Sequence, residues 1–157
     1  EKRRTGDGRP AAEASIMGPR AVCMDSKGNT YIAEREGNGV RKVDASGVMS
    51  TFAGTGERGY SGDGGPALAA TWGAPKALRC DQQGNILVVD TENHAIRKID
   101  VSTGIVTTVA GGHKGGEGDG GDAVNAGMDR PHGADVDAQG NIYIADSNNH
   151  RVRVVGI

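Results

Sequence analysis

The residues whose types invite a chemical role recur at fixed places in a repeat of 56 residues. One set directly follows a recurring proline and is basic or titratable in all three copies: Arg20, Lys76 and His132. Each is expected at the start of the innermost strand of its copy, where the copies converge around a central channel. A ring of such groups at a channel mouth would attract an anionic ligand or an acidic protein segment. The alternative interpretation is an exposed rim without a ligand.

A second set consists of one aspartate per copy within a Gly-Asp-Gly sequence: Asp7, Asp63 and Asp119. Carboxylates beside turn carbonyls suit a hard cation such as calcium. Each copy offers only one carboxylate, whereas calcium loops of the EF-hand type concentrate several. The favoured prediction is therefore structural: each aspartate caps the loop ahead of a short helix. No cofactor is expected, and calcium is the alternative.

Two histidines, His94 and His150, also occupy matching positions, with Asn38 at the equivalent place in the first copy. A zinc site needs three or four ligands that converge on one point. Positions one repeat apart are held in neighbouring copies, so convergence is not expected. We predict that these residues stabilise the turn in which they lie.

The two cysteines, Cys23 and Cys80, are displaced by one position when the copies are aligned. Neighbouring residues of a strand point to opposite faces of its sheet. We therefore expect no bridge between them and interpret both as small buried packing residues. The counterparts of Cys23 in the next two copies, Arg79 and Asp135, carry opposite charges. They are predicted to pair between adjacent copies and to fix their register.

Four short strands per copy would position these residues. Alternating apolar residues, β-branched residues and Gly-Asn turns predict their bounds: 21–25, 30–33, 40–43 and 48–53 in the first copy, 77–81, 86–89, 96–99 and 105–110 in the second, 133–137, 142–145 and 152–155 in the third. The third strand of each copy carries Arg41, Arg97 or Arg153 between apolar residues, which predicts a position nearer the solvent than the second strand.

The connections between copies contain Ala-rich segments. Pro66 to Trp72 places a proline where the first turn of a helix tolerates one, and predicts a helix of about two turns. Pro10 to Ile16 is its counterpart, and Asp122 begins the third occurrence. One domain over residues 1–157 is expected, divided as follows: connector 1–17, first blade with connector 18–72, second blade with connector 73–128, incomplete third blade 129–157.

Four antiparallel strands every 56 residues, apolar inside and charged outside, are typical of a β-propeller blade. The sequence resembles the NHL repeat, a β-propeller family, and the second copy carries the pattern throughout: Pro75 to Asp81, Gly84 to Asp90, Asn93 to Lys98 and Thr108 to Gly111. The insertion at 59–67 is similar to a subclass with long Gly-Asp-Gly-x-Pro-Ala loops between blades. The resemblance implies an all-β fold of about three blades, a partial ring with a short helix in each connection.

Three blades do not close a ring, because propellers typically contain about four to eight. An open stack would leave apolar blade faces and a strand edge in water. We expect a protein partner or a second copy to cover the two terminal faces. Two three-blade chains in one six-bladed ring would be the simplest closed form.

Composition narrows the function classes. A net charge of −2 and an aromatic content of 3% argue against nucleic-acid binding, which favours basic and aromatic surfaces. No apolar run approaches the roughly 18 residues of a membrane span. The resemblance implies a non-catalytic protein–protein interaction or scaffold module. The alternatives are part of a metal-dependent lyase or lactonase-like hydrolase, and an RNA-binding surface. An extracytoplasmic or organellar location is favoured because Glu1 is not an initiator methionine.

Overall fold

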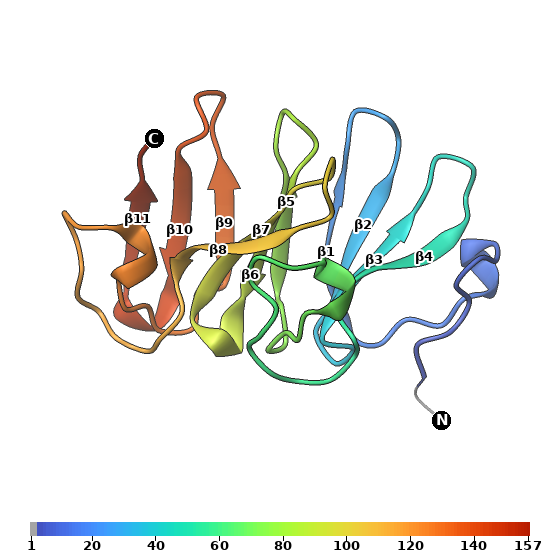
Figure 1. The fold of residues 1–157 in the computed structure, drawn as a ribbon, viewed down its shortest axis with the longest axis horizontal. Coiled ribbons are helices and arrows are strands. Elements are labelled where there is room, and N and C mark those ends of the chain that lie inside the picture. The colour runs from blue at the N-terminus through green and yellow to red at the C-terminus, as the bar shows by residue number, and fades with distance from the viewer. Residues whose placement is uncertain (1–2) are drawn as a thin grey trace.

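Three antiparallel β-sheets stand side by side in the computed structural model, which describes residues 3–157 (Figure 1). Glu1 and Lys2 of the predicted connector 1–17 lie outside the described residues. The strands of blades 1, 2 and 3 are, in order, β1 (Pro19–Met24), β2 (Thr30–Glu34), β3 (Gly39–Val43) and β4 (Met49–Ala53); β5 (Ala77–Cys80), β6 (Ile86–Asp90), β7 (Ala95–Ile99) and β8 (Val106–Gly111); β9 (Gly133–Val136), β10 (Ile142–Asp146) and β11 (Arg151–Val155).

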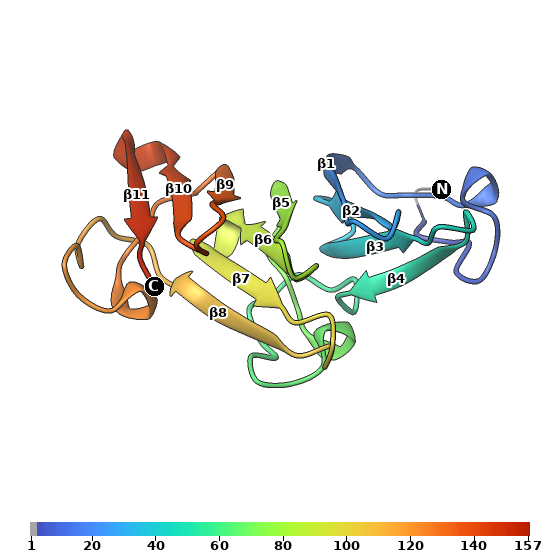
Figure 2. The ribbon, with the colours of Figure 1, turned by 90° about the horizontal axis from the view of Figure 1, so that it is seen from above.

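Within each blade, neighbours in sequence are neighbours in the sheet, with β1, β5 and β9 at one edge. Seen from above, the sheets fan out, and β5 lies between β1 and β9 (Figure 2). The predicted all-β fold of propeller blades is confirmed, with two four-stranded blades and one of three strands in the described residues.

Blade 2 lies between blades 1 and 3, so both of its faces are buried. Side chains alternate between the two faces of a strand, and all five residues of β6 are buried. Ile86 and Val88 pack toward blade 1 around Trp72. Leu87 and Val89 belong to the second core, formed with blade 3. Two apolar layers therefore hold three sheets together.

The third strands differ from the prediction, which placed their arginines near the solvent. Arg41 and Arg97 are fully buried. The arginines that suggested a position nearer the solvent are thus buried, although β11 as a whole is more exposed than β10. A guanidinium can be buried when its donors find acceptors. The connectors supply acceptors for all three nitrogens of Arg97, whereas the Nε of Arg41 has no hydrogen-bond partner.

The connecting helices are also shorter than predicted. Each is a single 3₁₀ turn of three residues rather than two helical turns: η1 (Ala11–Glu13), η2 (Ala67–Ala69) and η4 (Ala123–Asn125). Ala70 leaves η2 with extended dihedrals, because the connector doubles back on itself there. A Cβ on Gly62, whose φ is +95°, would lie 2.7 Å from the Cα of Ala70. Only glycine permits this approach.

Two further 3₁₀ turns, η3 (Thr91–Asn93) and η5 (Ser147–Asn149), join the second and third strands of blades 2 and 3. They were not predicted, since three polar residues carry no periodic signal. In the described part of the chain, no helix has the length and apolar character to cross a membrane.

Candidate functional site

The basic set after the recurring proline is only partly brought together. Lys76 lies just before β5 and His132 just before β9, and their Nζ and Nε2 atoms are 3.3 Å apart. Arg20, in β1, is exposed, and no contact joins it to either of them among the described residues. The structure thus places two of the three residues in one cluster at the junction of blades 2 and 3.

His132 has a partner on each of its two ring nitrogens. Its Nδ1 lies 2.7 Å from the carbonyl oxygen of Arg130, which only accepts hydrogen bonds. The Lys76 ammonium on the other side only donates. The tautomer that carries its hydrogen on Nδ1 donates to Arg130 O and accepts from Lys76 Nζ, so it satisfies both contacts. His132 thus links the side chain of Lys76 to the backbone of Arg130.

A glutamate and an arginine that no sequence pattern indicates complete this cluster: Glu92 and Arg130. Glu92 Oε1 accepts hydrogen bonds from Lys76 Nζ at 3.3 Å and from Arg130 Nη2 at 2.6 Å. Partial burial opposes ionisation of Glu92, but Arg130 and Lys76 outweigh it and lower the pKa of this carboxyl. Two cations and one carboxylate leave one positive charge, so the cluster can attract an anion.

The Gly-Asp-Gly aspartates have a different role from the predicted cap. None of the three connector helices receives a side-chain capping bond. Each aspartate instead pairs with the arginine of the third strand in the blade that follows: Asp7 with Arg41 at 2.7 Å, Asp63 with Arg97 at 2.8 Å, Asp119 with Arg153 at 2.7 Å.

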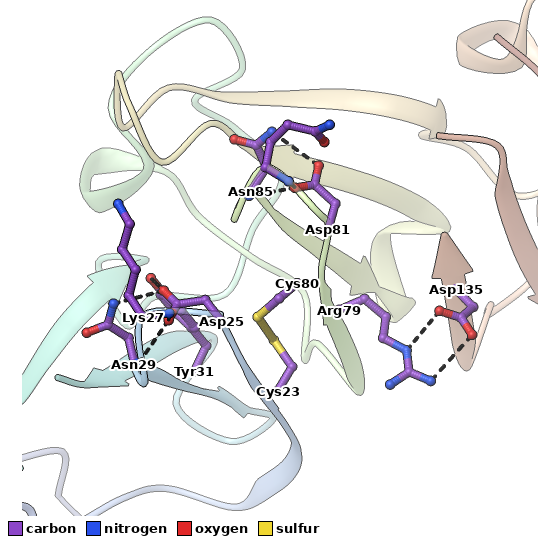
Figure 3. The surroundings of a disulfide bond; sticks show 11 residues. Cys23, Asp25, Lys27, Asn29, Tyr31, Arg79, Cys80, Asp81, Asn85 and Asp135 are labelled. Carbon is purple, nitrogen blue, oxygen red and sulfur yellow. Dashed lines mark hydrogen bonds and ion pairs between the residues drawn. A yellow bond between two sulfur atoms is a disulfide. The ribbon is translucent and has the colours of Figure 1, made fainter. Parts of the chain in front are cut away.

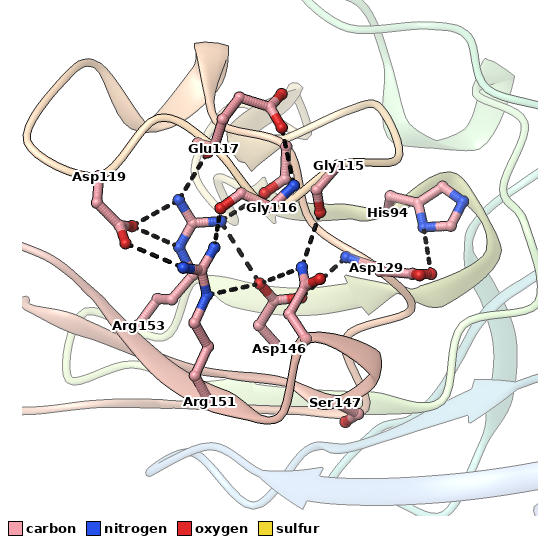
Figure 4. A network of polar contacts seen from close by, with 12 residues as sticks. His94, Gly115, Gly116, Glu117, Asp119, Asp129, Asp146, Ser147, Arg151 and Arg153 are labelled. Atoms are coloured by element: carbon pink, nitrogen blue, oxygen red, sulfur yellow. Dashed lines mark hydrogen bonds and ion pairs between the residues drawn. The ribbon is translucent and has the colours of Figure 1, made fainter.

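The arginine also captures carbonyl groups on both arms of the connector. Arg97 donates to the carbonyl oxygens of Ser61 at 2.7 Å and Thr71 at 2.8 Å. Arg97 also forms an ion pair with Asp90, the last residue of β6, with 3.5 Å between Nη1 and Oδ2. Figure 4 shows the equivalent network in blade 3, with Arg153 between Asp119 and Asp146. These bonds fasten each connector to the blade that it precedes.

The aspartate that ends the second strand accepts the same two kinds of hydrogen bond in blades 2 and 3. Asp90 accepts the backbone N–H of Gly73 at 2.7 Å and the amide of Asn93 at 2.9 Å. Asp146 does the same for Asp129 and Asn149, both at 2.8 Å. This holds the segment ahead of the recurring proline in place. The carboxylates recur in the sequence, but at the end of a strand they resemble ordinary turn residues.

The recurring histidines occupy turns, as predicted. His94 and His150 end η3 and η5 in the left-handed conformation, with φ of +54° and +56°. Asn38 in blade 1 has φ +47°. Burial lowers the pKa of His94 although Asp129 opposes this, and the unprotonated Nδ1 accepts the N–H of Arg130 at 3.1 Å.

The cysteine prediction was wrong, since Cys23 and Cys80 form a disulfide with a Cα–Cα distance of 6.1 Å (Figure 3). The two residues do point to opposite faces of their own sheets. When two blades stack, however, one face of the first blade packs against the opposite face of the second. Cys23 therefore points from blade 1 toward blade 2, and Cys80 points from blade 2 toward blade 1. A one-residue offset is what an inter-blade bridge requires.

The pair Arg79 and Asp135 joins β5 of blade 2 to β9 of blade 3. Nε of Arg79 lies 3.1 Å from Oδ1 of Asp135, and both side chains are largely exposed (Figure 3). An exposed ion pair contributes at most about 1 kcal/mol. Its geometry suits a contact between blades rather than chemistry.

Among residues 3–157, no three His, Cys, Asp or Glu side chains gather as ligands for a metal ion. Asp7, Asp63 and Asp119 each direct a carboxylate oxygen to an arginine. Calcium at these loops, and an anionic ligand at the Lys76 cluster, stay predictions.

Comparison with protein families gives two matches. A model described as "NHL repeat" matches residues 128–155, and one described as "Teneurin NHL domain" matches residues 1–61. The chain is 30% identical over 134 residues to Protein SUPPRESSOR OF QUENCHING 1, chloroplastic, of Arabidopsis thaliana, which covers 81% of the chain and 13% of that protein. It is 27% identical over 157 residues to NHL repeat-containing protein 2 of Bos taurus, covering 92% and 22%.

Solved structures share the fold at low identity. A protein of unknown function from Bacteroides thetaiotaomicron superposes with a TM-score of 0.76 and 22% identity, over 91% of this chain and 35% of that one. A streptogramin B lyase superposes with a TM-score of 0.62 and 16% identity, over 88% and 37%. The chain thus spans well under half the length of the proteins it matches. With its repeated blades and these matches, the chain belongs to the NHL-repeat family of β-propellers.

Proposed function

We propose that this chain is a non-catalytic NHL-repeat scaffold whose two terminal blade faces bind protein, either a second copy or another subunit. The supporting observation is the exposure of one repeat position. Val40 and Ile96 are 0% exposed between blades, whereas their counterpart Val152 on blade 3 is 69% exposed. The position is apolar in all three copies, but the described residues cover it in only two.

At the opposite end of the stack, an apolar residue is again exposed where its counterpart one repeat later is buried. Leu78 of blade 2 is buried against blade 1, whereas its counterpart Val22 on the free face of blade 1 is 63% exposed. Met24, two residues along β1, is exposed as well. Apolar side chains that alternate along an uncovered sheet mark an interaction surface.

An enzymatic role is the alternative, since a streptogramin B lyase shares the fold. At 16% identity that likeness carries the fold alone. A lyase or hydrolase of the metal-dependent kind needs a set of ligands, and the described residues offer no such group to name. The scaffold proposal rests on the exposed faces and names the residues that carry it.

The disulfide supports a proposal about compartment. Disulfides persist in oxidising surroundings and are rare where thiols are kept reduced. Cys23–Cys80 joins two blades, so we infer that the chain works in an extracytoplasmic or organellar compartment of that kind.

Light scattering over a concentration series tests the scaffold proposal. The chain is expected to associate beyond its own 16.1 kDa. Val152→Asp should abolish association and leave the circular dichroism spectrum unchanged. Ile96→Asp, at the matched position between blades, should unfold the protein because it buries an unpaired charge. A monomer at every concentration, unaffected by Val152→Asp, would overturn the second-copy form of the proposal.

A further inference from the structure

The residue before the recurring proline of blades 2 and 3 is held by a hydrogen bond from the preceding blade. This residue is Ala74 or Arg130, and its φ is positive in both cases, at +51° and +47°. Positive φ is uncommon for residues other than glycine, and the position before a proline favours extended backbone. Both residues therefore need contacts from their surroundings to keep this conformation.

The two junctions supply this contact from equivalent places but with different chemical groups. Between blades 1 and 2, Asn38 Oδ1 accepts the N–H of Ala74 at 3.2 Å. Between blades 2 and 3, His94 Nδ1 accepts the N–H of Arg130 at 3.1 Å. Asn38 and His94 occupy the same place in the repeat, and both have left-handed backbone. The same link is thus made by an amide at one junction and by an imidazole at the next.

Only one of these two acceptors responds to pH. The carbonyl oxygen of an asparagine accepts hydrogen bonds at any physiological pH, because the amide does not titrate. An imidazole nitrogen accepts only while it is unprotonated, and the charge of a histidine ordinarily changes between about pH 5 and 8. Protonation would place an N–H of His94 opposite the N–H of Arg130. Two donors would then face each other, and the link would be lost.

Charged groups of two elements act on the His94 ring. The connector ahead of blade 3 contributes Lys114, Asp129 and Arg130, and η3 contributes Glu92. Asp129 Oδ1 lies 3.8 Å from His94 Nδ1 (Figure 4), and Lys114 Nζ lies 3.6 Å from the other oxygen of Asp129. The two carboxylates favour the protonated ring, whereas the two cations oppose it. Asp129 is therefore the acceptor with which a protonated His94 would pair.

Burial keeps the ring neutral at neutral pH. The side chain of His94 is 20% exposed, and burial lowers its pKa below the ordinary value of 6.5, against the effect of Asp129. Because the pKa is lower in the folded chain than in the unfolded chain, the contribution of the link to stability is complete above about pH 6.5. It declines as the pH falls below that value. The link is thus intact at neutral pH and is lost in acid.

We propose that His94 is a pH-sensitive latch between blades 2 and 3, whose neutral ring holds the backbone of Arg130 and whose protonation releases it. The junction of blades 1 and 2 is held by Asn38 and by the disulfide, and neither of them titrates in mild acid. Acid therefore loosens one junction and leaves the other intact. The latch operates whether or not the terminal faces bind protein.

Release of Arg130 also reaches the cluster that contains Lys76. The carbonyl oxygen of Arg130 contacts Nδ1 of His132, and its Nη2 donates to Glu92 at 2.6 Å. Both contacts depend on the position of the Arg130 backbone, which the latch fixes. His132 is the other titratable ring in this cluster, and it contacts Lys76 and the Arg130 carbonyl.

Hydrogen exchange of single amides, followed by NMR on the whole chain at about pH 7.5 and about pH 5, tests the latch. Each rate is divided by the rate of an unstructured chain at the same pH, so that only protection is compared. Protection of the Arg130 amide should fall at least about tenfold in acid, because a buried N–H without an acceptor is costly. The Ala74 amide, which Asn38 holds, should keep its protection. Equal loss at both amides, or loss at neither, would overturn the proposal.

Exchanging the two acceptors provides matched variants. His94→Asn installs the pairing of the first junction, so the Arg130 amide should stay protected at both pH values. Asn38→His should make the Ala74 amide lose protection in acid. Asn and His adopt the left-handed conformation more readily than most residues, so both replacements suit their sites. His132→Asn should leave the pH dependence at Arg130 unchanged. If the Arg130 amide of His94→Asn loses as much protection in acid as that of the wild type, His94 is not the latch.

Discussion

Among single residues, the arginine of each third strand contributes most to the architecture. Arg97 is buried, yet it meets a carboxylate on the connector, a carboxylate at the end of β6 and two backbone carbonyls. The planar guanidinium offers five donors in a fixed fork, which a lysine ammonium cannot reproduce. Trp72 lies against the guanidinium, with 4.3 Å between Arg97 Cζ and the ring centroid, which adds a cation–π contact.

Replacing Arg97 by Ala is therefore expected to lower the free energy of unfolding by about 3–5 kcal/mol, because it leaves Asp90 as an uncompensated buried charge. Arg97→Lys should recover only part of the loss. Urea unfolding followed by circular dichroism gives the comparison. The matched control is Arg58→Ala on the exposed connector, expected within about 0.5 kcal/mol of the wild type. Equal effects of the two alanine variants would contradict the assigned role.

The arginine and the aspartate of this network both recur every 56 residues in the sequence. The sequence does not show that they pair. Period-two alternation along β7 places Arg97 on a face, and nothing in that period shows that a connector returns to cover it. Asp63 has the local features of a turn residue. The pairing depends on the path of a glycine-rich loop, which composition alone does not fix.

Among the elements, the first strands β1 and β5 form the tightest join between blades because a covalent bond crosses it. Strand existence was predictable from alternation and from the Asp-x-x-Gly-Asn turns, which place the strand starts well. The disulfide was not predictable in this way. Residues that point to opposite faces of their own sheets are brought together when the two sheets stack. The length of the connector helices was overestimated. An Ala-rich run after a proline favours a helix locally, but the connector forms only one 3₁₀ turn there.

Reduction of Cys23–Cys80 should lower the free energy of unfolding by about 2–4 kcal/mol, because the bond closes a long loop in the unfolded chain. The two cysteines are 57 residues apart. Thermal unfolding with and without a thiol reductant measures the effect. The double variant Cys23→Ser, Cys80→Ser should be insensitive to reductant. If the wild type is equally insensitive and keeps free thiols, the bridge does not form.

Taken as a whole, the molecule is a stack whose middle blade has two neighbours and whose outer blades have one each. The stability of such an array is approximately a sum of repeat and interface contributions. Both cores include blade 2, whereas blades 1 and 3 each take part in one.

Hydrogen exchange followed by mass spectrometry should reveal this gradient. Amides of β6 are expected to exchange most slowly, since its five residues are buried. Amides of β11 should exchange fastest among the strands, because Val152 and Val154 are exposed and β11 pairs only with β10 within residues 3–157. Uniform protection across the three blades would show instead that the chain opens as one unit or that its free faces are covered.

Each connector is hydrogen-bonded into the blade that follows it, as Asp63 is to Arg97 and Gly64 to Val106. The natural boundary of a transplantable blade is therefore the linker near Glu57, ahead of the connector, and not the start of the first strand. A recombinant propeller assembled from blocks cut at that linker would inherit every aspartate with its own arginine. Blocks cut at the recurring proline would instead depend on each new neighbour to supply the partner.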